Sequence, residues 1–95
     1  MGLEKTMEIQ FTSQVFKEGS TYVAYAPELD VSSCGPSQEK AQANLVEAAR
    51  LFLEEARKMG PLGQILEEAG YVRKDHRFEG PQFVSMEPVV LPLPS

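Results

Sequence analysis

The 95-residue chain carries nine Lys and Arg against fourteen Asp and Glu, which gives a net charge of −5. This balance argues against a nucleic-acid-binding surface, because phosphate contacts need clustered basic side chains. A composition with 42% hydrophobic and 24% charged residues is typical of a folded protein. At this length we expect one domain, over residues 1–91, followed by a flexible tail at 92–95. Every apolar run is shorter than the roughly 20 residues of a membrane span.

The cysteine count and the N-terminus indicate the cell compartment. Cys34 is the only cysteine, so an intramolecular disulfide is excluded. The first residues, MGLEKTMEIQF, lack the apolar segment of a secretory signal. We therefore expect the protein in the reducing cytoplasm.

Strand patterns occupy the first third of the chain. Residues 7–11 alternate apolar and polar side chains, and Val15 continues the same phase. A short polar loop at 17–20 leads to a second strand at 21–26, which is rich in β-branched and aromatic residues. Two such runs joined by a tight loop predict a β-hairpin. Residues 31–34 are predicted as a short third strand.

The apolar period changes from two residues to 3.6 at Ser37, which we predict as the N-cap of a long helix that ends at Gly60. A second, short helix over 62–69 follows Pro61, since proline is well tolerated at a helix start. One apolar stripe runs along the long helix: Ala41, Leu45, Ala48, Ala49, Phe52, Ala56 and Met59. A stripe so rich in alanine predicts close packing of this helix on a sheet.

The C-terminal part of the chain is less regular. Residues 71–80 are charged, and we expect irregular structure there. The last strand is predicted at 83–91, with Val84 and Met86 on one face. Pro88 interrupts its row of backbone donors, so we expect this strand at a sheet edge or with a bend at Pro88.

The predicted order is strand, strand, strand, long helix, short helix, strand. The simplest packing is an α+β fold in which an antiparallel sheet has the long helix on one face. The other face of the sheet is then exposed to solvent, and a small domain with one exposed sheet face buries little of its apolar surface. A second copy of the chain is the simplest cover, so we expect a homodimer or a larger homo-oligomer.

Few residues could carry catalysis. His76 is the only histidine, and as a general base it would need a nucleophile or substrate beside it. Cys34 precedes a helix N-terminus, where a thiol can become nucleophilic, but the sequence indicates no base for it. Glu28 and Asp30 are too few carboxylates for a metal site. We therefore expect no catalytic residue, no cofactor and no bound metal in this chain.

Three parts of the sequence resemble the HicB-like antitoxin family. They are YVAYAPEL at 22–29, Cys34-Gly35, and the helix that Ser37 opens, with Asn44, Glu47 and Ala48. The similarity continues from Gly60 through ILEEAGY at 65–71, so it covers about residues 7–71. The resemblance implies a partial RNase H-like fold, usually oligomeric, in a short member of the family without its DNA-binding extension.

The resemblance also implies a function in binding. Proteins of this kind cover the active site of a small basic RNase toxin of the HicA type, with no chemistry of their own and, in this case, no direct nucleic-acid contact. The acidic charge of the chain agrees with a basic partner. We predict partner contacts at Tyr25, Glu28, Asp30, Val84 and Met86. Two alternatives stay open: an orphan homo-oligomeric interaction domain with no toxin partner, and a vestigial metal-dependent nuclease that uses Glu8, Glu28 or Asp30.

Overall fold

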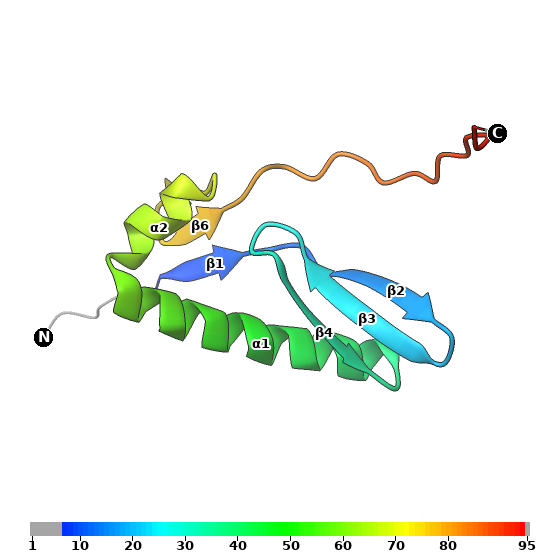
Figure 1. The fold of residues 1–95 in the computed structure, drawn as a ribbon. Coiled ribbons are helices and arrows are strands. Elements are labelled where there is room, and N and C mark those ends of the chain that lie inside the picture. Colours follow the sequence, from blue (N-terminus) through cyan, green and yellow to red (C-terminus); the bar gives the residue numbers. More distant parts are fainter. Residues whose placement is uncertain (1–6, 95) are drawn as a thin grey trace, which may run out of the picture.

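A computed structural model describes residues 7–94 and shows an α+β fold, as predicted (Figure 1). The elements in chain order are β1 (Glu8–Gln10), β2 (Gln14–Glu18), β3 (Thr21–Ala26), β4 (Val31–Gly35), α1 (Gln38–Met59), α2 (Leu62–Glu68), β5 (Val72–Lys74) and β6 (Arg77–Glu79). They form two small sheets, one in the order β2-β3-β4 and one in the order β1-β6-β5. No helix within residues 7–94 has the length and apolar character needed to cross a membrane.

The β2-β3-β4 sheet is antiparallel and confirms a hairpin and a third strand. The predicted loop at 17–20 is wrong in its start, because Lys17 and Glu18 belong to β2 and the turn is at 19–20. Val15 lies opposite Ala24, and Ala24 lies opposite Ser33. The two-residue period of β3 directs Ala24 and Ala26 toward α1, where both are fully buried. Small side chains at these two positions let the helix come close to the sheet.

The prediction that residues 7–11 extend the hairpin strand is wrong. Residues 11–13 are not strand, and β1 leaves the hairpin to pair with β6 in a parallel register, Ile9 opposite Phe78. The backbone N–H of Glu8 donates to the carbonyl of His76 at 2.7 Å. The single antiparallel sheet expected from the sequence is therefore two sheets, because β1 finds its partner near the other end of the chain.

The helix α1 begins and ends where the sequence predicts. The Ser37 hydroxyl accepts the backbone N–H of Lys40 at 3.1 Å, which satisfies one of the free donors of the first turn. The helix buries Ala41, Leu45, Ala49 and Ala56. A Cβ at Gly35 would lie 2.8 Å from the backbone nitrogen of Ala41, so only glycine allows β4 to approach the helix this closely.

The short helix α2 ends in a Schellman motif that turns the chain into β5. Gly70 has a φ of 98°, and its N–H donates to the Glu67 carbonyl at 3.0 Å. The Tyr71 N–H donates to the Leu66 carbonyl at 2.9 Å. Both Leu66 and Tyr71 are buried in the core, so the cap also fixes a hydrophobic contact.

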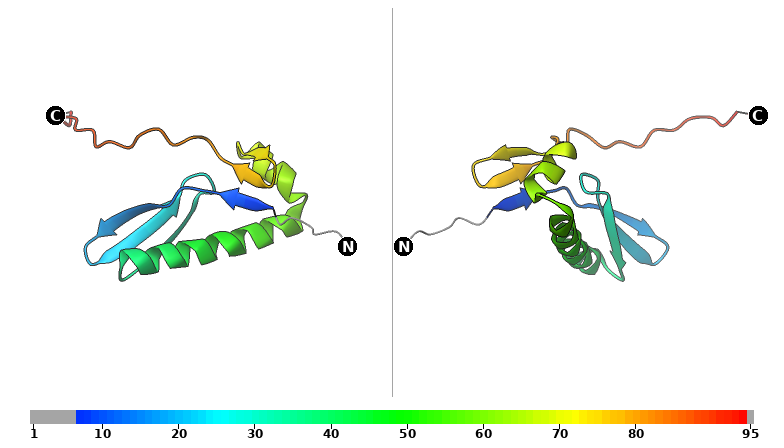
Figure 2. Two further views of the ribbon diagram at one scale, coloured as in Figure 1. Left: turned by 180° about the vertical axis from the view of Figure 1, so that it is seen from behind. Right: turned by 60° about the vertical axis from the view of Figure 1, so that its left-hand side comes forward.

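Two predictions for the C-terminal part are wrong. Residues 71–80 are not irregular, since β5 and β6 form a hairpin whose turn holds Asp75 at a φ of 53°. The strand predicted at 83–91 does not form. Residues 83–94, which we call the C-terminal arm, have no secondary structure and extend away from both sheets (Figure 2).

The arm changes the overall shape of the protein. The radius of gyration is 16.5 Å, whereas a compact chain of this length has about 12 Å. The principal extents are 65 × 30 × 24 Å. In all three views the arm and α1 lie on opposite sides of the β2-β3-β4 sheet (Figures 1 and 2).

Candidate interaction surface

The face of the β2-β3-β4 sheet turned away from α1, which we call the outer face, has an apolar centre. Figures 1 and 2 show α1 on the opposite face, and the C-terminal arm, which has no secondary structure, on the side of the outer face. Phe16 remains 44% exposed there. Strand alternation assigns eight residues to this face: Gln14, Phe16, Glu18, Thr21, Val23, Tyr25, Ser32 and Cys34.

A tyrosine and a carboxylate that are hydrogen-bonded to each other lie at one end of the outer face. The Tyr25 hydroxyl donates to Asp30 Oδ1 at 3.0 Å. Asp30 has a φ of 54°, a left-handed conformation that aspartate tolerates in turns. The hydrogen bond to Asp30 raises the pKa of the Tyr25 hydroxyl above its ordinary value, and partial burial and the charge of Asp30 act in the same direction. The structure thus brings two of the predicted contact residues together.

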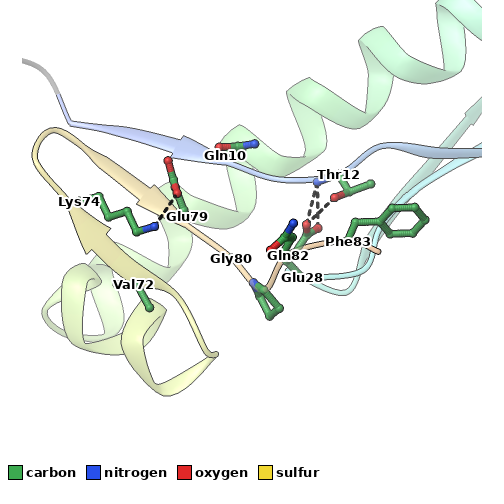
Figure 3. A pocket seen from close by; sticks show the side chains of 10 residues that line it. Gln10, Thr12, Glu28, Val72, Lys74, Glu79, Gly80, Gln82 and Phe83 are labelled. Atoms are coloured by element: carbon green, nitrogen blue, oxygen red, sulfur yellow. Dashed lines mark hydrogen bonds and ion pairs between the residues drawn. The ribbon is translucent and has the colours of Figure 1, made fainter. Parts of the chain in front are cut away.

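Glu28, the third predicted contact residue in this loop, is already bonded within the chain. Its carboxylate accepts the backbone N–H of Thr12 at 2.9 and 3.0 Å and the Thr12 hydroxyl at 2.7 Å. These bonds tie the loop after β3 to the segment that joins β1 and β2 (Figure 3). Glu28 therefore holds the two sheets in their relative positions.

A polar pocket of about 510 Å³ lies beside this bonded pair (Figure 3). The ammonium of Lys74 and the carboxylate of Glu79 form an ion pair at 3.4 Å in its wall. The other lining residues are Gln10, Thr12, Glu28, Val72, Gly80, Pro81, Gln82 and Phe83. Residues 80–83, which lead into the C-terminal arm, therefore form one side of the pocket.

Tyr71 packs behind Glu28 and Gly80. A Cβ at Gly80 would lie 3.0 Å from Glu28 Cγ and 3.4 Å from the Tyr71 ring, which shows how tightly the three residues meet. The Tyr71 hydroxyl is buried and has no hydrogen-bond partner among the described residues. Burial, and to a smaller extent the charge of Glu28, raises the pKa of Tyr71 to about 12.

The remaining predicted contact residues, Val84 and Met86, lie on the C-terminal arm. Val84 is 85% exposed and Met86 is 61% exposed. They do not lie on one face of a strand, as the sequence predicts, because the arm is not part of either sheet. Both side chains are open to a partner.

The residues weighed as catalytic or metal-binding candidates lie in different parts of the structure. Cys34 is an exposed free thiol on the outer face, and His76 is exposed in the turn between β5 and β6. The Glu8 carboxylate pairs with Arg77 at 3.3 Å, away from Glu28 and Asp30, which have the partners described above. Within residues 7–94 no three His, Cys, Asp or Glu side chains are grouped closely enough to hold a metal ion.

Comparison of the chain with protein-family models, curated proteins and solved structures finds no match. The resemblance to HicB-like antitoxins and the RNase H-like fold that it implies stay predictions.

The sequence reasoning missed the bond between Thr12 and Glu28 and the hairpin at 72–79. No local sequence pattern predicts the bond between Thr12 and Glu28, because the two residues are 16 positions apart. The second has a weak signal in VRKDHRFE, where Asp75 suits a turn and Phe78 is the single apolar residue of β6. An isolated aromatic residue between charged neighbours shows no period, so the strands were not recognised.

Proposed function

We propose that this protein is a non-enzymatic binding module that neutralises a small basic RNase toxin of the HicA type by covering its active site. The uncovered outer face carries the proposal. Its apolar centre, with Phe16 opposite Val23, lies between the carboxylates of Glu18 and Asp30. An apolar centre with a charged rim is the usual anatomy of a protein–protein interface.

The charge of the chain favours a basic partner. The net charge is −5, so opposite charges would speed the encounter and select against acidic partners. In this proposal Tyr25 and Asp30 contact the toxin, whereas Glu28 shapes the loop that presents them. The reducing cytoplasm is the compartment we propose, since Cys34 is an exposed thiol.

The first experiment is a binding assay with the product of a small basic reading frame next to the gene. We expect a complex and a parallel loss of the partner's RNase activity. The dissociation constant should increase with salt concentration, because opposite charges contribute to binding. Failure of any such product to form a complex, or a complex that leaves RNase activity unchanged, would refute the proposal.

Point variants then locate the binding surface. Phe16→Ala should raise the dissociation constant at least about tenfold, because a central aromatic side chain typically dominates such an interface. Val46→Ala is the matched control: Val46 is similarly exposed but lies on α1, away from the outer face. Equal effects of the two variants would remove the outer face as the binding site.

A second candidate function is an orphan homo-oligomeric interaction domain with no toxin partner. The exposed C-terminal arm favours it, because a long apolar segment at the surface marks a site of protein association. The vestigial nuclease is a weaker proposal, since Glu8, Glu28 and Asp30 each have a different partner.

A further inference from the structure

We propose that the C-terminal arm of one copy pairs with the free edge of β2 in a second copy, as an added edge strand. The arm is rich in exposed apolar side chains. Seven of them are between 50% and 92% exposed: Phe83, Val84, Met86, Val89, Val90, Leu91 and Leu93. A contiguous exposed apolar segment of this length marks a site of protein association.

The positions of the prolines show how the arm can pair. In an extended strand, alternate residues direct their backbone groups to the same edge, and proline removes a donor from that edge. The three prolines of the arm, Pro88, Pro92 and Pro94, all have even numbers. The odd-numbered residues from Phe83 to Leu93 therefore keep a complete row of N–H donors on the other edge. The arm can pair with one neighbour, and its proline edge prevents a further strand from adding.

The free edge of β2 is the acceptor that fits best. β2 is an edge strand of five residues, and the arm has five residues, Phe83 to Glu87, before its first proline. The edge strands β1 and β5 have only three residues each. The free edge of β4 is partly used, because Asn44 Nδ2 donates to the Cys34 carbonyl at 2.8 Å.

The buried area is sufficient for a stable dimer. A fully buried Val, Leu, Ile, Phe or Met side chain removes about 60–120 Å² of apolar surface from water. Seven such side chains in each of two arms, with equal areas of acceptor surface, would bury on the order of 1,600–3,300 Å². Stable interfaces bury about 1,200–2,000 Å². The three apolar side chains of Phe83–Glu87 alone would bury only about 700–1,400 Å², so the apolar residues after Pro88 must also dock on the second copy.

The charges also favour a second copy over a basic partner at this site. Two chains with a net charge of −5 repel each other unless they meet through neutral surfaces. Residues 83–94 include a single charged side chain, Glu87, and β2 carries one of each sign, Lys17 and Glu18. The two surfaces therefore meet without a cluster of like charges.

The arm of each chain lies on the side of the β2-β3-β4 sheet away from α1 and pairs with no strand of residues 7–94, so we place the pairing between different molecules (Figures 1 and 2). This pairing does not require a toxin, and the two proposals can fail separately. A toxin would cover the outer face, whereas the arm uses the edge of β2. Loss of one interaction need not remove the other.

Sedimentation equilibrium of the full chain over a range of concentrations tests the dimer. We expect a species of twice the 10.5 kDa mass of one chain. Ser85→Pro removes a donor from the pairing edge and should weaken the dimer at least about tenfold, whereas Ser85→Ala should change it less than about twofold. Val84→Pro removes a donor from the other edge, so it should match Val84→Ala.

All four substitutions lie in the exposed arm, and circular dichroism should confirm that each variant stays folded. A monomer at every concentration overturns the proposal. A dimer that Ser85→Pro leaves unchanged also overturns it, because the arm then plays no part. Equal weakening by Ser85→Pro and Val84→Pro overturns the assignment of the pairing edge.

Cross-linking locates the acceptor. The background is Cys34→Ser, and one chain carries Ser85→Cys. This chain is mixed with a second chain that has cysteine at one of positions 14–18, each in turn. We expect a disulfide-linked species of two different chains for at least one position of β2, because paired strands bring Cβ atoms within disulfide distance. Glu47→Cys on α1 is the control. Cross-links at no position of β2, or equally at Glu47, overturn β2 as the acceptor.

Discussion

Glu28→Ala tests whether the carboxylate that joins the two sheets supports the fold. The substitution removes the acceptor of two donors, the Thr12 N–H and the Thr12 hydroxyl. A hydrogen bond to a charged group contributes about 1.5–3 kcal/mol when it is well buried. Because this pair is only partly buried, we expect a total loss of about 2 kcal/mol in the free energy of unfolding.

Urea unfolding followed by circular dichroism measures this loss. A protein of this size has an m value of about 1–3 kcal/mol per molar urea, so the midpoint should fall by roughly 1 M with m unchanged. Glu28→Gln keeps one oxygen that can accept the Thr12 N–H, and it should lose about half as much.

Glu55→Ala is the control for removing one carboxylate. Glu55 pairs with Lys58 on an exposed face of α1, and this pair should contribute at most about 0.5 kcal/mol. A double-mutant cycle of Thr12→Ala with Glu28→Ala should give a coupling energy of at least about 0.5 kcal/mol, because the hydroxyl and carboxylate are in direct contact. If Glu28→Ala shifts the midpoint no more than Glu55→Ala does, the carboxylate is not a structural link and the reasoning fails.

Three further variants test the core and the helix cap. Tyr71→Phe should leave stability unchanged or raise it by about 1 kcal/mol, because it removes a buried hydroxyl that has no partner among the described residues; lower thermal stability would contradict this. The pKa of Tyr71 is raised from 10.0 to about 12 in the folded chain. The unfolded chain therefore loses this proton first, and the free energy of unfolding decreases as the pH rises from 10 toward 12. Urea titrations at several pH values should therefore show a smaller decrease above pH 10 for Tyr71→Phe than for the unmodified chain, and identical curves would exclude the raised pKa. Ser37→Ala should cost about 1 kcal/mol in urea unfolding, since the hydroxyl caps the Lys40 N–H, and a loss below about 0.3 kcal/mol would show that the cap is not needed. Leu45→Ala should cost about 2–5 kcal/mol and lower the thermal midpoint, because Leu45 is fully buried; a change below about 1 kcal/mol would mean that the core repacks around the smaller side chain.

The candidate surface could be predicted only in part. Tyr25 and Asp30 are five residues apart and meet through one turn, so their contact depends on local sequence, whereas their role in binding a partner stays a prediction. Glu28 has the same local setting, yet its carboxylate is bonded to a residue in another segment. Whether a loop carboxylate faces a partner or its own chain depends on which segment packs beside it, and periodicity does not contain that information.

The sequence by itself determined the elements whose stability is local. Ser37 and Gly60 mark the ends of α1 because capping acts within a few residues. The hairpin formed by 14–18 and 21–26 also depends on a tight local loop, although its first strand begins at Gln14 and not at residue 7 as the alternation predicts.

Only the tertiary structure decided the partners that are distant in the chain. β1 and β6 come together although residues such as Glu8 and Arg77 are 69 positions apart. Strands of three residues are too short to show a period, and they gain their stability only when the partner strand supplies hydrogen bonds and the core supplies burial. Residues 83–91 have a pattern that suits an edge strand, but they belong to neither sheet, because a period alone does not bring a partner strand beside them.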